Sequence, residues 1–246
     1  MPNGSLYDQL NPRDSHCKPL TWEHRANAAL GIARGLTHLH SIPIFHGDIK
    51  SSNILLDKHF EPKIGDFGTA AIMARGVGAE LPVESHITMQ KVCGSVDYLP
   101  DDYLRSRQGR PEVDIFSFGI LLFELMSGKH PGHRIDGDTF RNIIARLPKA
   151  PSPSHWFDSA IGLKIKTFEF AIMTVSGGYT MATTTVPEQL FLFGKICAKV
   201  NYRKRPKMSD VLQGLDKLHK QIQSYVSTYK TSADQLDDKV DEPMIF

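Results

Sequence analysis

Four polar residues in the stretch 45–68 have the types and the spacing to bind a metal ion and a phosphate. Asp48, Lys50 and Asn53 precede one short apolar run, and Asp66 follows a second. Carboxylate and amide oxygens are hard ligands suited to Mg²⁺, and an ammonium can face a phosphate as a point charge. The alternative is a surface hairpin whose Asp and Asn side chains bond their own backbone in turns. Four such residues together favour the phosphate-handling interpretation.

A β-hairpin with strands 53–56 and 63–66 would position these side chains. In an antiparallel hairpin the start of the first strand lies beside the end of the second, so Asn53 is predicted to lie next to Asp66. Asp48 is five residues upstream of Asn53, within reach of the same cleft.

Hydrophobic periodicity predicts helices around this hairpin, over 22–40, 113–126, 187–200 and from Met208 onward. Thr21 is of the type that caps a helix N-terminus. The run 113–126 is apolar nearly all round, which is typical of a helix buried on every side. Residues 69–112 show no sustained period.

Three further segments are less regular. A short helix is expected over 138–147. The Thr-rich, aromatic stretch 161–186 has strand-like or irregular character and is interpreted as an insertion or a gene-model artefact. The polar, acidic residues 221–246 are predicted to form a disordered tail.

Composition excludes several classes of protein. The net charge of +2 over 246 residues gives no general attraction to nucleic acid or to anionic membrane. The three cysteines are far apart and lack CxxC spacing, which argues against a disulfide framework or a zinc site. No signal peptide is recognisable. The longest apolar stretch, 115–126, is interrupted by Ser117 and Glu124 and is too short to span a bilayer. A cytoplasmic location is predicted.

HGDIKSSN, followed by the DFG that begins at Asp66, resembles the catalytic loop and metal-binding turn of protein kinases. By that resemblance, Asp48 is the catalytic base and Lys50 contacts the transferred phosphate. Asn53 and Asp66 are the implied Mg²⁺ ligands, and Leu55 is the implied floor under the adenine. ATP and Mg²⁺ are therefore the expected cofactors.

The resemblance covers about residues 1–158 and 187–220 of the expected kinase domain, which is predicted to span residues 1–220. GSVDYLPD resembles the substrate-positioning loop and the APE-type motif, with Asp101 where glutamate is usual and Arg205 as its expected partner. Asp114 resembles the aspartate that opens the buried central helix and anchors the catalytic loop.

The usual control of the expected activation segment is altered at one residue of the catalytic loop. Gly47 replaces the arginine that usually precedes the catalytic aspartate and pairs with a phosphorylated residue. Ser85 and Thr88 lie in this segment and are the candidate phosphorylation sites.

Within kinases, MPNGSL, GIARGLTHLH, HGDIKSSNILLD and DYLPDDYL are similar to the Pelle and interleukin-1-receptor-associated kinase family. Plant receptor-like kinases share several of these strings. The resemblance implies a mainly α (α+β) fold, a kinase large lobe with a catalytic β-hairpin. No Gly-rich loop or strand lysine occurs, and the chain begins where the family's hinge would lie, so the small lobe is expected to be absent.

The function implied by this resemblance is that of a serine/threonine protein kinase in Toll/interleukin-1-receptor-type innate immune signalling. The expected partners are protein substrates with Ser or Thr and adaptor proteins of a receptor complex, which could recruit the protein to the plasma membrane. The alternative is a truncated, non-catalytic scaffold or decoy in the same complex.

Overall fold

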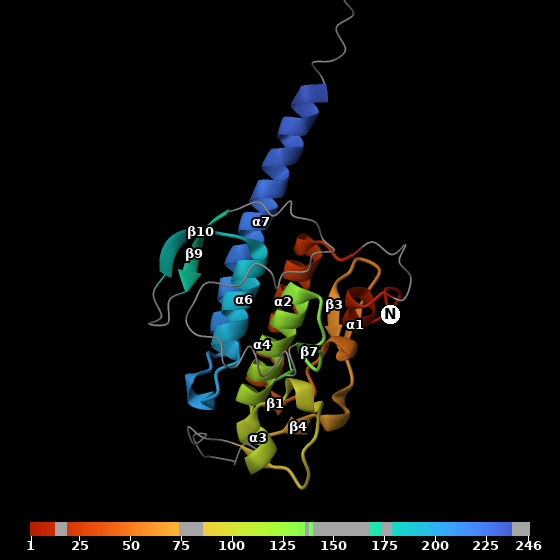
Figure 1. Ribbon diagram of the computed structural model, residues 1–246, viewed down its shortest axis with the longest axis vertical. Helices are drawn as coiled ribbons and strands as arrows, with labels where there is room; N and C mark the ends of the chain where they lie inside the picture. The colour runs from red at the N-terminus through yellow and green to blue at the C-terminus, as the bar shows by residue number, and fades with distance from the viewer. Residues whose placement is uncertain (13–18, 74–85, 136–137, 140–167, 174–178, 238–246) are drawn as a thin grey trace, which may run out of the picture.

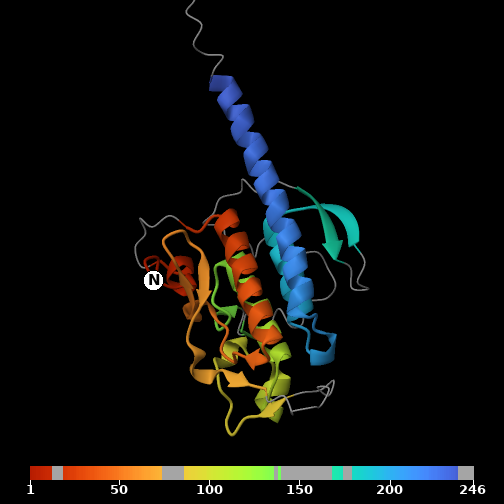
Figure 2. The same cartoon turned by 180° about the vertical axis from the view of Figure 1, so that it is seen from behind.

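The computed structural model describes residues 1–12, 19–73, 86–135, 138–139, 168–173 and 179–237. Helices dominate these residues, as predicted. The four longest are α2 (Trp22–Ser41), α4 (Pro111–Ser127), α6 (Val186–Cys197) and α7 (Met208–Asp237). Figure 1 shows them roughly aligned along the long axis, with α7 extending beyond the body of the molecule, and Figure 2 shows α2 and α7 side by side from behind.

The other elements are short. The remaining helical turns are α1 (Leu6–Leu10), η1 (Ser51–Asn53), η2 (Phe67–Thr69), η3 (Val96–Tyr98), α3 (Asp101–Ser106) and η6 (Tyr202–Lys204). Strands in the described residues pair antiparallel in twos: β1 (Ile44–Phe45) with β4 (Ala71–Ile72), β2 (Ile54–Leu56) with β3 (Pro62–Ile64), β5 (Ile87–Thr88) with β6 (Gln108–Gly109), β7 (Arg134–Ile135) with β8 (Asp138–Thr139), and β9 (Phe168–Met173) with β10 (Tyr179–Thr184).

Helix α2 forms as predicted and supports the β2–β3 hairpin. The Thr21 hydroxyl accepts the His24 N–H and caps its first turn. Two glycines of α2 leave room for strand β3 to lie against the helix surface. A Cβ on Gly31 would lie 2.4 Å from Pro62, and one on Gly35 would lie 2.8 Å from Ile64. The hairpin can therefore pack closely against α2.

Helix α4 is the centre of the core, which confirms the prediction of a helix buried on every side. Every residue from Val113 to Ser127 is buried. The helix ends at Gly128, whose φ of 66° lies in the left-handed region that glycine adopts easily.

Two predictions about the C-terminal half need correction. The prediction of a helix over 138–147 is wrong at its start, because Asp138–Thr139 form strand β8, which pairs with β7. Residues 140–147 lie outside the described residues. The disordered tail expected over 221–246 is also wrong as far as Asp237, because α7 continues to that residue. Neither Gly nor Pro occurs between Gly214 and Pro243 to stop it. The strand-like prediction for 161–186 is confirmed at β9 and β10.

Candidate active site

The β2–β3 hairpin forms, with a register one residue away from the predicted one. Ile54 pairs with Ile64, and the Gly65 N–H donates to the Asn53 carbonyl at 2.8 Å. Asn53 therefore lies opposite Gly65, and Asp66 is one residue further on. The polar ends of the two strands still meet at the same end of the hairpin.

The Asp48 carboxylate is the centre of a hydrogen-bonded cluster. One oxygen accepts the Ser95 backbone N–H at 2.9 Å. The other accepts the Asn53 amide at 3.1 Å and lies 2.7 Å from the Lys50 ammonium. The Lys50 ammonium also donates to the Ser95 hydroxyl at 2.9 Å. Asp48, Lys50 and Asn53, which the sequence singled out, are therefore brought together, and Ser95 joins them from a distant loop.

This environment keeps Asp48 ionised. Burial by itself would raise the pKa of Asp48, but hydrogen bonds from Lys50 and Ser95 and the charge of Lys50 outweigh it, so the pKa lies below its ordinary value. An ionised carboxylate held from several sides can accept and orient a hydroxyl proton.

The proposed metal ligands lie at the open end of the hairpin. The Asn53 NH₂ group donates to the Asp48 carbonyl at 2.9 Å as well as to the carboxylate, so its amide oxygen is turned away from Asp48. Asp66 is exposed and has φ 59°, and one of its oxygens accepts the Gly68 N–H at 3.3 Å. Amide and carboxylate oxygens are a donor set that fits Mg²⁺. Leu55 is half-buried in the middle of β2.

Asp114, in the first turn of α4, holds the backbone just before Asp48. Its two oxygens accept the N–H groups of His46 and Gly47, each at 2.9 Å, and His40 lies 3.1 Å away. Gly47 has φ 81°, a conformation that most residues adopt only with strain. The anchoring implied by the resemblance is present.

The loop that carries Ser95 directly touches the loop that carries Asp48. Gly94 has φ 98°, and a Cβ there would lie 2.2 Å from the Gly47 carbonyl oxygen. No side chain fits at that position, so glycine lets the two loops meet beside Asp48.

The predicted partner of Arg205 is wrong. The buried Arg205 guanidinium binds Asp102 at 2.7 Å, while the exposed Asp101 pairs with Arg105 at 3.9 Å. Because α3 begins at Asp101, consecutive side chains point in different directions around the helix, and only Asp102 faces Arg205.

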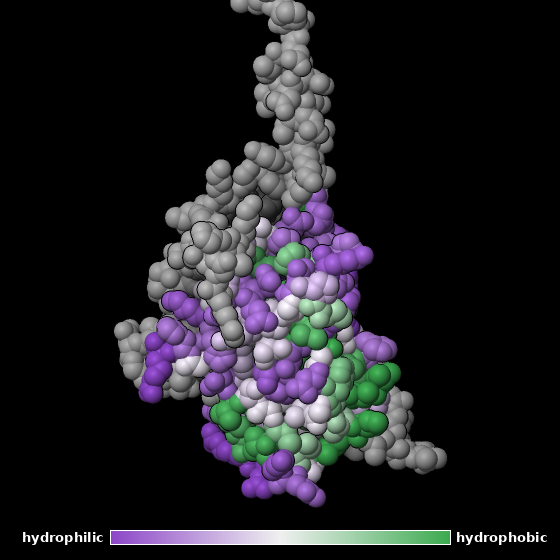
Figure 3. Space-filling view, turned by 90° about the vertical axis from the view of Figure 1, so that its right-hand side faces the viewer, coloured by the Kyte–Doolittle hydropathy of each residue, from purple (hydrophilic) through white to green (hydrophobic). Residues whose placement is uncertain are grey.

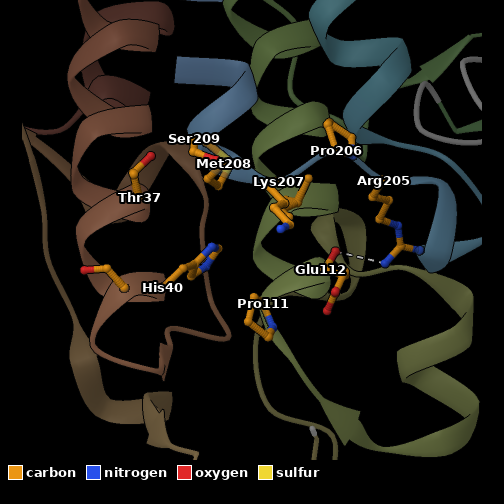
Figure 4. Close-up of a pocket in the computed structure, with 11 residues that line it drawn as sticks. Thr37, His40, Pro111, Glu112, Arg205, Pro206, Lys207, Met208 and Ser209 are labelled. Atoms are coloured by element: carbon orange, nitrogen blue, oxygen red, sulfur yellow. Dashed lines mark hydrogen bonds between the residues drawn. The ribbon is translucent and has the colours of Figure 1, made fainter. Parts of the chain in front are cut away.

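Arg205 also forms part of the wall of a pocket of about 360 Å³ between α2, α4 and the start of α7. Figure 4 shows His40 on the opposite wall and the bond of Arg205 to the Glu112 carbonyl, which measures 2.9 Å.

Of the two candidate phosphorylation sites, Thr88 is exposed on β5, where it pairs with Gln108 of β6. Ser85 lies outside the described residues. Sequence reasoning missed three buried residues behind the cluster, Ser51, Tyr98 and Glu124, which are joined by hydrogen bonds. The signal was Glu124, the one acidic residue in the apolar stretch 115–126.

The surface of the molecule is partly apolar. Figure 3 shows apolar side chains gathered in the lower half of one face and hydrophilic ones above them. Large apolar residues that are exposed include Ile42, Phe67 and Ile72. No helix in the described residues combines the length and apolar composition that a bilayer span requires.

The helical body with few short strands is consistent with the kinase-like fold that the motifs implied. The family model described as "Protein kinase domain" matches residues 1–215. The chain belongs to the protein kinase domain family.

Three relatives show where in that family its similarities lie. Interleukin-1 receptor-associated kinase 1 of Mus musculus is 42% identical over 132 residues, which cover 52% of this chain and 18% of the mouse protein. A Pelle-like serine/threonine-protein kinase of Caenorhabditis elegans is 44% identical over 135 residues, covering 52% of this chain and 27% of that protein. Wall-associated receptor kinase-like 1 of Arabidopsis thaliana is 31% identical over 250 residues, covering 99% of this chain and 30% of the plant protein. The chain thus spans less than a third of the length of each. Both groups that the motifs resembled, Pelle-type and plant receptor-like kinases, are among its relatives.

Proposed function

We propose that the site around Asp48 transfers the γ-phosphate of ATP to a Ser or Thr hydroxyl of a protein substrate. The observation that carries this proposal is the cluster in which Lys50, Asn53 and Ser95 hold both oxygens of Asp48. Phosphoryl transfer depends mainly on positioning and on charge stabilisation, and this cluster supplies a fixed carboxylate beside a cation.

In the proposed reaction, the substrate hydroxyl oxygen attacks the γ-phosphorus while the bond from that phosphorus to the ADP oxygen breaks. The hydroxyl proton passes to Asp48, which is ionised because Lys50 and Ser95 stabilise its charge. Lys50 offers its ammonium to the phosphoryl oxygens. Asn53 and Asp66 would hold Mg²⁺, which neutralises phosphate charge when bound.

We further propose that the protein acts in Toll/interleukin-1-receptor-type innate immune signalling, as a cytoplasmic kinase that receptor adaptors recruit to the plasma membrane. Support comes from the similarity to the mouse and nematode proteins, whose names include "Interleukin-1 receptor-associated" and "Pelle-like". This part of the proposal concerns the whole natural protein and its partners.

The test uses the natural full-length protein, expressed as wild type, Asp48→Asn and Glu61→Gln. The Glu61 variant is a matched control, because this exposed carboxylate lies at the other end of the same hairpin. Each protein is assayed for transfer from labelled ATP to a protein substrate, followed by phosphoamino-acid analysis. Mg-ATP binding is measured in parallel as a shift in melting temperature, since a ligand that binds only the folded state must stabilise it.

The expected result is phosphoserine or phosphothreonine with wild type and E61Q, and a loss of transfer of roughly 100-fold or more with D48N. D48N should keep the Mg-ATP shift. Full transfer by D48N would overturn the role of Asp48, and phosphotyrosine would overturn the substrate class. Absence of both transfer and an ATP shift in wild type would favour the non-catalytic scaffold.

A further inference from the structure

A buried carboxylate lies directly behind the active site. Glu124 of α4 is 0% exposed, and no ion pair to it is recorded among the described residues. Its two oxygens accept hydroxyl groups instead, from Ser51 at 2.8 Å and from Tyr98 at 2.5 Å. The two hydroxyl oxygens are themselves 3.3 Å apart, which completes a compact triad.

Each hydroxyl belongs to a loop that holds Asp48. Ser51 follows Lys50 directly and begins the turn that ends at Asn53. Tyr98 ends the turn that follows Ser95. The two loops thus meet twice, on the reactive side through Asp48 and Ser95 and on the buried side through Glu124.

We propose that Glu124 is a positioning residue for phosphoryl transfer, which holds the Asp48 loop and the Ser95 loop in register through Ser51 and Tyr98. This inference rests on the proposed function. Glu124 lies in the core, behind the loops, so it acts through them.

Stability alone does not account for a carboxylate at this position. Removing a charged group from water is costly, and apolar side chains of similar volume are often as stable or more stable in a core. A fully satisfied buried network does, however, restrict its partners to one arrangement. Both oxygens of Glu124 are satisfied, and both partners are loop residues of the site.

A second contact between α4 and the same loop provides a matched control. The Ser117 hydroxyl donates to the Tyr98 carbonyl at 2.9 Å, and Ser117 is buried like Glu124. Ser117→Ala therefore removes a hydrogen bond from the same helix to the same tyrosine and leaves Ser51 untouched. Loss of general support should appear in both variants, whereas loss of register between the two loops should appear only when Glu124 changes.

The experiment compares wild type with Glu124→Leu, Glu124→Gln and Ser117→Ala. Glutamine keeps one acceptor oxygen and can donate to the other hydroxyl, so E124Q should stay folded even if E124L does not. Hydrogen exchange of the backbone at 48–53 and 94–98 measures loop order without requiring activity. Steady-state transfer gives kcat and the KM for ATP, measured well below each variant's melting temperature.

We expect faster exchange in both loops and a kcat lower by roughly 10- to 100-fold in E124L, with little change in the KM for ATP. E124Q should recover most of the kcat, and S117A should keep it. Equal kcat in wild type, E124L and E124Q, or unchanged exchange in both Glu124 variants, would overturn the positioning role. A wild type that transfers no phosphate would instead overturn the proposed function, and the register of the two loops would then be judged from exchange alone.

Discussion

Replacing Glu124 by Gln should change how the stability of the protein depends on pH. Burial raises the pKa of Glu124 from 4.5 to about 7, although hydrogen bonds from Tyr98 and Ser51 act in the opposite direction. The folded state therefore holds a proton on this group over a range of pH in which the unfolded chain has released it. The stabilising contribution of Glu124 is complete below about pH 4.5 and is lost as the pH rises to about 7.

The size of the effect follows from that shift. Raising the pKa of one group from 4.5 to about 7 corresponds to about 3 kcal/mol of unfolding free energy. Glutamine resembles the protonated acid in shape and does not titrate. The difference in unfolding free energy, E124Q minus wild type, should thus increase by about 3 kcal/mol between pH 4 and pH 8.

Urea unfolding followed by circular dichroism at several pH values measures this difference. With an m-value of about 2–3 kcal/mol/M, the gap between the two midpoints should change by about 1 M urea across the range. Titrations elsewhere in the protein cancel in the comparison. Parallel stability curves for wild type and E124Q would refute the argument that burial raises the pKa of Glu124.

Two further predictions concern contacts that position the loops. Asp102→Asn should destabilise the protein by about 3 kcal/mol in urea unfolding, because the buried Arg205 loses its counter-charge. Asp101→Asn should change the unfolding free energy by less than about 0.5 kcal/mol. Similar losses in both variants would contradict the assignment of Asp102 as the partner of Arg205. Gly94→Ala should lower the unfolding free energy by about 2 kcal/mol or more, because a φ of 98° is unfavourable for alanine and the new Cβ meets the Gly47 carbonyl oxygen. If the variant unfolds at the same urea concentration as wild type, the two loops do not touch there.

The hairpin and the long helices could be predicted because each has a local cause. Polar residues at the ends of two apolar runs indicate paired strands, and the 3.6-residue period of α2 is plain from the sequence. The register could not be predicted, because it depends on the connecting turn. There the Asp57 carboxylate accepts the N–H groups of His59 and Glu61, and Phe60 takes φ 62°. This turn sets Asn53 opposite Gly65.

The errors at the site arose where the answer depends on contacts between distant segments. Motif spacing could not distinguish Asp101 from Asp102, because the choice depends on where α3 begins and which face turns toward Arg205. Glu124 was recognised in the sequence as an interruption of an apolar stretch, but its partners lie in two loops far away in sequence. Only the folded chain brings them together.

Helix α4 explains how loops with little regular structure can hold Asp48 and its neighbours in a fixed geometry. Asp114 and Glu124 are ten residues apart along the chain, so they lie on the same side of the helix. Asp114 binds the backbone before Asp48, and Glu124 joins Ser51 to the Tyr98 hydroxyl. Loops that carry functional residues depend on a rigid scaffold for their precision. In this protein, a buried helix supplies that scaffold through Asp114 and Glu124, and each of them holds a loop beside Asp48.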